Sequence, residues 1–266
     1  TGTVVNRIPT ATDPFNIAVD DAHGQVFVGY SNLPAYAVYD IAAGTLGSPI
    51  TLTGGPSNAY TYDVAFDPIE RRVYFGAYGS TGNVWVVDAD TRLQTGWYAV
   101  PDGDGDLTTL PGSGLVFVGS AYNGNISTVD TGTGEITSID LGGSSYINGV
   151  TANPVTRMVY GLDGGTNKAH YLGVQWAPIR SNSTVALPGA TRGAAYTTSI
   201  AVDGSPTPTY SVTAGTLPAG LTLDAMTGVI SGTPTEAGPF TFTVSASNSR
   251  GTAATVHTLT VSGASK

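Results

Sequence analysis

The chain has 266 residues, a formal net charge of −9 and only 11% charged residues, with 36 glycines and 16 prolines. This composition is typical of a turn-rich all-β protein, and no stretch shows the sustained 3.6-residue apolar period of an amphipathic helix. With ten basic residues and no basic cluster, the sequence excludes nucleic acid as an expected partner. The lack of cysteine excludes disulfides, zinc–thiolate sites and thiol nucleophiles.

Four similar segments recur in the first two thirds of the chain, at 16–29, 63–76, 106–119 and 148–161. Each combines a short strand, a polar turn and an aromatic-bearing strand that ends in Gly. After each of the first three come a third strand ending in Asp and then a fourth strand. Four strands in about 40 to 45 residues is the period of a β-propeller blade. The sequence therefore predicts an all-β fold that begins with a four-repeat β-propeller over residues 1–177.

The repeat motifs, such as DVAFDPIERRVYFG followed by WVVD, resemble the YVTN/lactonase-like propeller repeats. The resemblance implies blade architecture, and such repeats serve enzymes, adhesins and scaffolds alike. The fourth repeat lacks an outer strand, whereas residues 1–10 have the pattern of an outermost strand. We expect this N-terminal strand to complete the last blade and so remove an exposed edge. Upstream blades, or two chains paired into a larger ring, are the alternatives.

A second module follows a linker at 178–186 and extends over 187–263. Its strands alternate apolar and polar residues, as in PFTFTVSA, and turns recur every 8 to 12 residues as expected for a β-sandwich. In LPAGLTLDAMTGVISGTP, Asp224 can cap the turn and Gly228 can supply a positive φ. The stretch resembles the Ig-like, cadherin-like module of bacterial surface proteins. Near His257 the alternation changes parity, which predicts a bulge.

Candidate ligand-binding residues come from the repeat alignment. Ten residues before each second-strand motif stand Asn16, Asp63, Asp106 and Asn148. In a propeller this position begins the innermost strand, so the four side chains would ring one mouth of the central channel. Such a ring could bind Ca²⁺ through Asp63 and Asp106, with carbonyls or water completing the shell. Alternatively, each side chain fixes its own loop. The alternating aspartates of PDGDGDL (101–107) are a second, weaker calcium pattern.

Aromatic residues gather at the same strand ends, namely Phe15, Tyr60, Tyr62 and Tyr146. Flat rings beside Asn and Asp suit a sugar, because the rings stack on its apolar face while the polar groups bind its hydroxyls. The alternative is that tyrosine is simply a favoured strand residue. The three histidines lie in no nucleophile or metal-ligand motif, so we expect them to be structural and predict no catalytic residue.

These features favour a non-enzymatic, extracellular binding or adhesion protein, secreted or at the cell surface. Its propeller would be a recognition head for a surface glycan or protein, and its Ig-like module a spacer. No apolar run of membrane length is present, so no membrane insertion is expected. One alternative is a structural subunit of a surface filament or virion, self-associating through terminal strand pairing. Another is a propeller lactonase or lyase. The favoured function requires no cofactor, and Ca²⁺ is an optional one.

Overall fold

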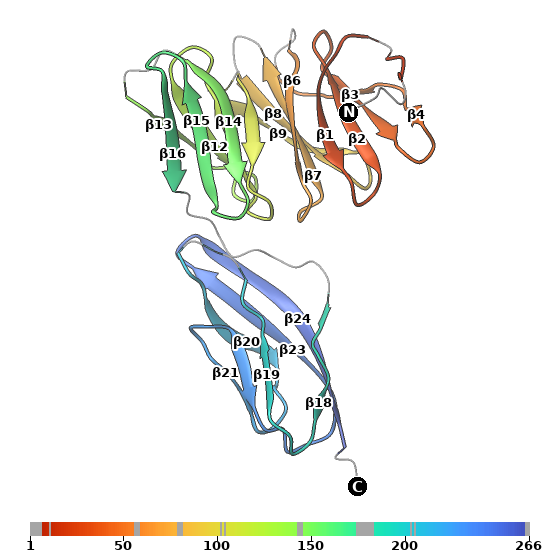
Figure 1. Ribbon diagram of the computed structural model, residues 1–266, viewed down its shortest axis with the longest axis vertical. Helices are drawn as coiled ribbons and strands as arrows, with labels where there is room; N and C mark the ends of the chain where they lie inside the picture. The colour runs from red at the N-terminus through yellow and green to blue at the C-terminus, as the bar shows by residue number, and fades with distance from the viewer. Residues whose placement is uncertain are drawn as a thin grey trace, which may run out of the picture. The chain divides into compact units, whose positions relative to one another are not determined.

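A computed structural model describes residues 7–10, 12–55, 59–78, 82–101, 103, 105–142, 146–173, 184–202, 204 and 206–263. These residues form 24 strands in six sheets, without a helix, which confirms the all-β prediction. Accordingly, this part of the chain contains no helix able to cross a membrane. The chain divides into two compact units, Thr1–Gly173 and Val174–Lys266, and each is described by itself (Figure 1).

The first unit contains four antiparallel sheets, called blades 1 to 4 in chain order. Blade 1 comprises β1 (Pro14–Asp20), β2 (Gln25–Tyr30), β3 (Ala35–Asp40), β4 (Thr45–Leu46) and β5 (Ile50–Thr51). Blade 2 comprises β6 (Tyr60–Asp67), β7 (Arg72–Tyr78), β8 (Gly82–Asp88) and β9 (Gln94–Val100). Blade 3 comprises β10 (Leu107–Thr109), β11 (Leu115–Gly119), β12 (Asn125–Asp130) and β13 (Ile136–Asp140). Blade 4 comprises β14 (Ile147–Asn153), β15 (Met158–Asp163) and β16 (Lys168–Gly173).

The blades follow the predicted repeats, and their strands are paired in chain order. In blade 1 the outer strand is split between β4 and β5, both of which pair with β3. Blade 4 has three strands among the described residues. The predicted outer strand from the N-terminus falls mainly on residues 1–6, which lie outside the described residues, and residues 7–10 form no strand. The pairing of that strand stays a prediction.

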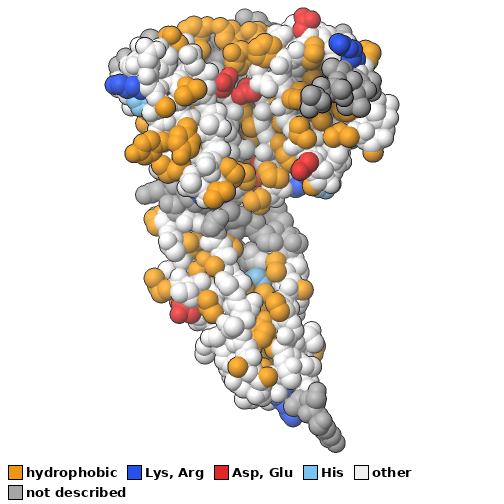
Figure 2. Space-filling view, viewed as in Figure 1, with side chains coloured by type: hydrophobic (Ala, Val, Ile, Leu, Met, Phe, Trp, Pro, Cys, Tyr) orange, Lys and Arg blue, Asp and Glu red, His pale blue; other side chains and the backbone are white. Residues whose placement is uncertain are grey.

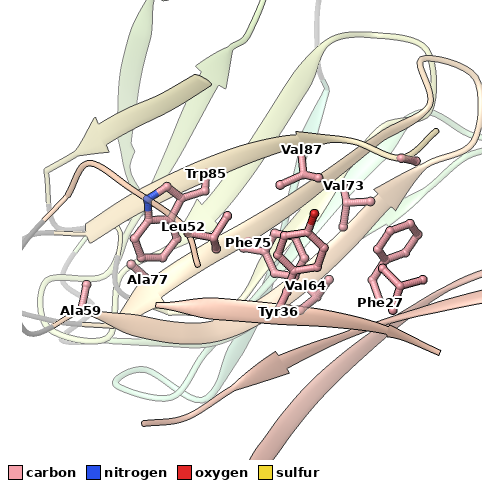
Figure 3. Close-up of a cluster of buried hydrophobic side chains, with 12 residues drawn as sticks. Phe27, Tyr36, Leu52, Ala59, Val64, Val73, Phe75, Ala77, Trp85 and Val87 are labelled. Carbon is pink, nitrogen blue, oxygen red and sulfur yellow. The ribbon is translucent and has the colours of Figure 1, made fainter. Parts of the chain in front are cut away.

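Consecutive blades pack face to face. We call the side of a blade that packs on the preceding blade its front, and the opposite side its back. Between blades 1 and 2, Phe27 and Val38 from the back of blade 1 join Val64, Phe75 and Trp85 from the front of blade 2 in one buried cluster (Figure 3). A second cluster joins blade 2 to blade 3 in the same way. Since each burial removes large apolar side chains from water, these interfaces hold the blades in order.

A glycine lies at or near the end of the second strand of blades 1, 2 and 3 for a steric reason. A Cβ on Gly76 would lie 2.6 Å from the side chain of Leu107 in the next blade. On Gly119 it would lie 2.9 Å from Ile147, and Gly29 is crowded by blade 2 in the same way. The predicted closing glycines therefore let the inner strand of the following blade approach closely.

The front of blade 1 differs from the other fronts in its exposure. Hairpin register places Ile17 at the position of Val64, Leu107 and Val150 in blades 2, 3 and 4. Those three residues are 7%, 4% and 8% exposed, whereas Ile17 is 56% exposed. Val19, on the same face, is also exposed. This packing position is therefore buried in blades 2, 3 and 4 and exposed in blade 1.

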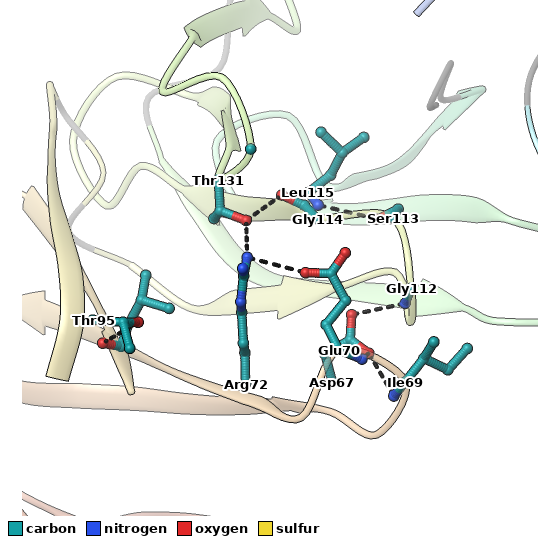
Figure 4. Close-up of polar contacts among 12 residues, drawn as sticks. Asp67, Ile69, Glu70, Arg72, Thr95, Gly112, Ser113, Gly114, Leu115 and Thr131 are labelled. Atoms are coloured by element: carbon teal, nitrogen blue, oxygen red, sulfur yellow. Dashed lines mark hydrogen bonds and ion pairs between the residues drawn. The ribbon is translucent and has the colours of Figure 1, made fainter. Parts of the chain in front are cut away.

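The turn end of the unit, where the first and second strands of each blade meet, is fixed by polar contacts between blades. Asp67 accepts hydrogen bonds from the N–H groups of its own turn and also from Gly112 N in blade 3, at 2.7 Å. Arg72 donates to Thr131 of blade 3 at 3.1 Å (Figure 4). Arg71 donates to Asp20 of blade 1 at 2.6 Å. All these donors and acceptors are paired within the protein, so this end is structural.

The second unit is a β-sandwich. One sheet contains β17 (Val185–Ala186), β18 (Ala190–Thr191), β20 (Thr209–Gly215), β23 (Gly238–Asn248) and β24 (Gly251–Ser262). The other contains β19 (Tyr196–Ser199), β21 (Leu221–Leu223) and β22 (Val229–Gly232). Tyr210, Phe242 and Leu259 from the first sheet meet Leu221 and Ile230 from the second in the core.

Two local predictions for this unit need correction, and one is confirmed. Val185 and Ala186, assigned to the linker, already pair in parallel with β24. The predicted bulge at His257 is wrong, because β23 and β24 pair without a register shift and His257 points inward opposite Phe242. Asp224 accepts hydrogen bonds from two N–H groups of its turn, at 2.8 and 3.0 Å, as predicted.

Candidate ligand site at the mouth of the blades

The mouth of the first unit is the end where the inner strands β1, β6, β10 and β14 begin, opposite the turn end (Figure 1). A β-bulge interrupts β1, β6 and β14 at this end. Bulges change the direction in which a side chain points, and they are common beside functional sites. Three of the four predicted site residues, Asn16, Asp63 and Asp106, come from equivalent positions on consecutive blades.

Asp63 joins three blades. Its carboxylate accepts hydrogen bonds from Asn16 Nδ2 of blade 1, from Val64 N of its own strand at 2.8 Å, and from Leu107 N of blade 3 at 2.7 Å. It is only 9% exposed. Burial raises the pKa of Asp63 to about 6; the two N–H groups oppose the rise and the negative charge of Asp106 adds to it. Asp63 therefore acts as a loop tie, the alternative considered for this position.

Asp106 is different, because its carboxylate accepts no hydrogen bond and makes no ion pair with the described residues. Burial raises its pKa. Its Oδ2 lies 3.4 Å from the point where Gly149 of blade 4 would carry a Cβ, so the missing side chain leaves room beside it. Asp63 and Asp106, called the mouth carboxylates below, thus have unequal roles: the first is saturated with donors and the second is not.

Asn148 does not occupy the fourth equivalent position. The inner strand of blade 2 ends with Asp67 opposite Arg72, and that of blade 4 ends with Asn153 opposite Met158. Counting four residues back from these ends gives Asp63 in blade 2 but Gly149 in blade 4. The repeat alignment was therefore one residue out of register in blade 4, and the predicted ring of four side chains is reduced to three.

A row of aromatic rings lies beside the mouth carboxylates. Ring centroids are 5.2 Å apart for Phe15 and Tyr62, 5.4 Å for Tyr62 and Tyr78, and 5.5 Å for Tyr60 and Tyr78. The hydroxyls of Tyr78 and Tyr122 are 2.6 Å apart, which extends the row to blade 3. We call these five residues the aromatic row. Phe15 and Tyr122 are 54% and 65% exposed, so both ends of the row are open to solvent.

The aromatic row adjoins the mouth carboxylates, because Tyr62 directly precedes Asp63 on β6. Burial raises the pKa of the Tyr62 hydroxyl, and the charges of Asp106 and Asp63 raise it further, in that order. This coupling places Asp106 within electrostatic range of the row. Figure 2 shows hydrophobic side chains gathered along the upper rim of this unit, with acidic side chains among and below them. The arrangement can stack a ligand ring and at the same time offer it a carboxylate.

Some predicted residues lie elsewhere, and some site residues were missed. Tyr146 is partly exposed, and its ring lies over Gly164 in the turn between β15 and β16 rather than in the row. Tyr78 and Tyr122 were not predicted. Tyr78 ends the second strand of blade 2, as Tyr30 ends that of blade 1, and Tyr122 lies three residues after that of blade 3. A tyrosine within three residues after the closing glycine of blades 1, 2 and 3 was therefore the available signal.

The described residues contain no group of three or more His, Asp or Glu side chains that could hold a metal ion. Asp102 and Asp104 of the second calcium pattern lie outside the described residues. Ca²⁺ binding at the mouth carboxylates therefore stays a sequence-based prediction. The histidines expected to be structural include His23 and His170, which lie 3.1 Å from Asp20 and Asp163.

Comparison with known proteins gave one family match, in the second unit, and several similar solved structures. The family described as "Putative Ig domain" matches residues 177–262. A Bacteroides fragilis protein described as a "putative alpha-galactosidase" is 31% identical over 34% of this chain and 19% of that chain, with a TM-score of 0.30. The WD40 repeats of RRP9 are 10% identical over 68% and 56% of the two chains, with a TM-score of 0.49. A chain of a nidogen/laminin complex is 17% identical over 62% and 66%, with a TM-score of 0.47.

The chain spans between 19% and 66% of the length of these three solved proteins. No match was found among curated proteins. The fold is thus all-β, with four propeller-type blades followed by an Ig-like β-sandwich.

Proposed function

We propose that the chain is a non-enzymatic, extracellular binding protein whose propeller mouth recognises a carbohydrate and whose Ig-like unit serves as a spacer. One observation carries the proposal: five aromatic residues from three blades form a continuous row next to the carboxylate of Asp106, which has no hydrogen-bond or ion-pair partner among the described residues. Sugar rings present flat C–H faces that stack on aromatic rings, and their hydroxyls bond to carboxylates and amides. Adhesion at a cell surface is the context that such a head and spacer suit.

The test is a glycan array followed by calorimetry on any sugar that binds. Tyr62→Ala removes the ring that contacts both Phe15 and Tyr78, so it should lower affinity at least tenfold, since stacking contacts are worth about 1 kcal/mol or more each. Tyr171→Ala is the matched control, because Tyr171 is an exposed tyrosine on β16 outside the row. An array without any bound glycan, or equal affinities for the two variants, would contradict the proposal.

A structural subunit is the second candidate, and the open front of blade 1 favours it. Exposed Ile17 and Val19 occupy positions that other blades bury, so a partner surface would gain the same apolar contact. Self-association should then appear as a mass that rises with concentration in light scattering, and Ile17→Glu should abolish it. Val155→Glu, at an exposed turn position, is the control. A constant monomer mass at all concentrations would exclude this role.

An enzyme of the propeller lactonase or lyase type is the third class, implied by the repeat resemblance. It would need a general base at the mouth. We would assign that role to Asp106, because the carboxylate of Asp63 already accepts hydrogen bonds from three N–H groups. We favour binding over catalysis because the row offers aromatic surface rather than an acid–base pair. Turnover of a panel of lactones that Asp106→Asn abolishes would reverse this preference.

A further inference from the structure

Asp106 is the least satisfied polar group at the mouth. Its side chain is partly buried, has no hydrogen-bond donor among the described residues, and lies beside the space left by Gly149. Its neighbour Asp63 is also acidic, and the carboxylate oxygens of Asp63 already accept hydrogen bonds from three N–H donors. A partly buried carboxylate without a donor loses hydration and gains nothing in exchange. Within the described part of the chain, the carboxylate of Asp106 has no group that compensates its lost hydration.

The surroundings of Asp106 define what would compensate it. A ligand group with a positive charge and N–H donors would compensate it best, since it pairs with Asp106 and is also attracted by the second carboxylate nearby, which repels an anion. It must also fit against aromatic rings, because Tyr62 couples electrostatically to Asp106 and contacts Phe15 and Tyr78. An ammonium group satisfies both conditions, since ammonium–carboxylate hydrogen bonds are strong and aromatic faces attract cations.

We infer that the mouth binds a carbohydrate bearing a free amine, with the ammonium group paired to Asp106 and the sugar ring stacked on the aromatic row. This inference rests on the proposed carbohydrate-binding function and narrows its ligand class to amino sugars. The sugar ring meets the row through its C–H face, and the ammonium points into the space beside Gly149. Asp63 keeps its structural bonds and contributes only its charge.

The experiment compares glucosamine, N-acetylglucosamine and glucose by calorimetry on the full chain. The three probes share one ring and differ only at C2, so they isolate the charge of the amine. We expect glucosamine to bind roughly tenfold or more tightly than the other two, as a charge-assisted hydrogen bond provides. Asp106→Asn should remove this preference, and 0.5 M NaCl should weaken glucosamine binding alone. Asp21→Asn, at an exposed turn, is the control.

The outcomes separate the two proposals. If all three sugars bind equally to the wild-type protein, or if Asp106→Asn keeps the preference for glucosamine, the amine inference is wrong while carbohydrate binding stands. If no sugar binds here or on the array, the proposed function itself fails. Should Asp106→Asn not fold, the comparison of the three sugars on the wild-type protein still decides. Displacement of bound glucosamine by Ca²⁺ at micromolar concentration would instead assign the site to the metal.

Discussion

The raised pKa of Asp63 makes the stability of the first unit depend on pH in an unusual direction. The pKa of Asp63 is about 6 in the folded chain, against an ordinary value of 3.8. A carboxyl whose folded pKa exceeds its unfolded pKa binds protons more readily when folded, so stability falls as pH rises from about 4 to about 6. The full difference is worth about 3 kcal/mol, and lowering the pH from 7.5 to 5.0 should recover about 1 kcal/mol of it.

Other shifted groups do not reverse this trend in that pH range. The pKa of Asp20 is lowered, so its contribution to stability is lost only as the pH falls below its unfolded value of 3.8. The pKa of Asp106 is raised by burial and acts in the same direction as Asp63. The pKa of His257 is lowered, and that residue belongs to the second unit. The gain between pH 7.5 and 5.0 should therefore come from the mouth carboxylates.

Urea unfolding followed by tryptophan fluorescence is the appropriate assay, because two of the three tryptophans, Trp85 and Trp97, lie in the first unit. Asp63→Asn should remove about 1 kcal/mol of the gain between pH 7.5 and 5.0, as the amide does not titrate. Asp21→Asn should leave the gain unchanged. Equal gains for the wild type and Asp63→Asn would refute the assignment of the raised pKa to Asp63.

Three further perturbations test the interfaces and the mouth. Gly76→Ala should lower the free energy of unfolding by roughly 1 to 3 kcal/mol, because its Cβ would meet Leu107 at 2.6 Å, whereas Gly173→Ala, with open space around it, should change little. Asp67→Ala should cost about 2 to 3 kcal/mol, since Gly112 N and two N–H groups of its own turn lose their acceptor. Calcium should raise the melting temperature if the sequence-based metal site exists, and replacing both mouth carboxylates by amides should abolish the rise; melting curves that are identical with calcium and with chelator would exclude it.

The sequence allowed the blades to be predicted because their determinants are local. A short strand, a turn and a strand ending in glycine recur, and the glycine has a packing reason that each blade repeats. The predicted register of blade 4 is wrong because the segment from Met158 to Gly161 resembles the second-strand motif of the other blades. It lies one residue before the position that is equivalent in the structure. Aligning the turns would have succeeded: Arg71 and Arg157 both follow Pro at the same spacing, and both adopt a positive φ.

The site was only partly predictable because it depends on contacts between blades. The Asn and Asp side chains at the strand starts could be found by period, but the use of Asp63 as an acceptor for two other blades is a tertiary property. The aromatic row depends on Tyr78 and Tyr122, whose positions follow from the paths of two loops. At His257, side-chain polarity suggested a bulge, whereas the regular ladder simply places a histidine on the inner face.

The repeat also shows where blade packing stops. Register places Leu162 of blade 4 at the position of the closing glycines, and Leu162 is 56% exposed. In blade 4, the large residue Leu162 on the second strand pairs with the small Ala169 on the third. In blade 3 the order is reversed, because Gly119 on the second strand pairs with the larger Ile126 on the third. A side chain at this position blocks the close approach that each closing glycine permits.

The two outer faces of the first unit are therefore not equivalent. The back of blade 4 cannot receive another inner strand as blades 1 to 3 do, because Leu162 fills the space. The front of blade 1 keeps the apolar pattern of a packed face, with Ile17 at the position of buried Val64. Phe15 begins the aromatic row only two residues before Ile17. A partner that covers this front would reach the rim of the ligand site, so association and ligand binding should influence each other through blade 1.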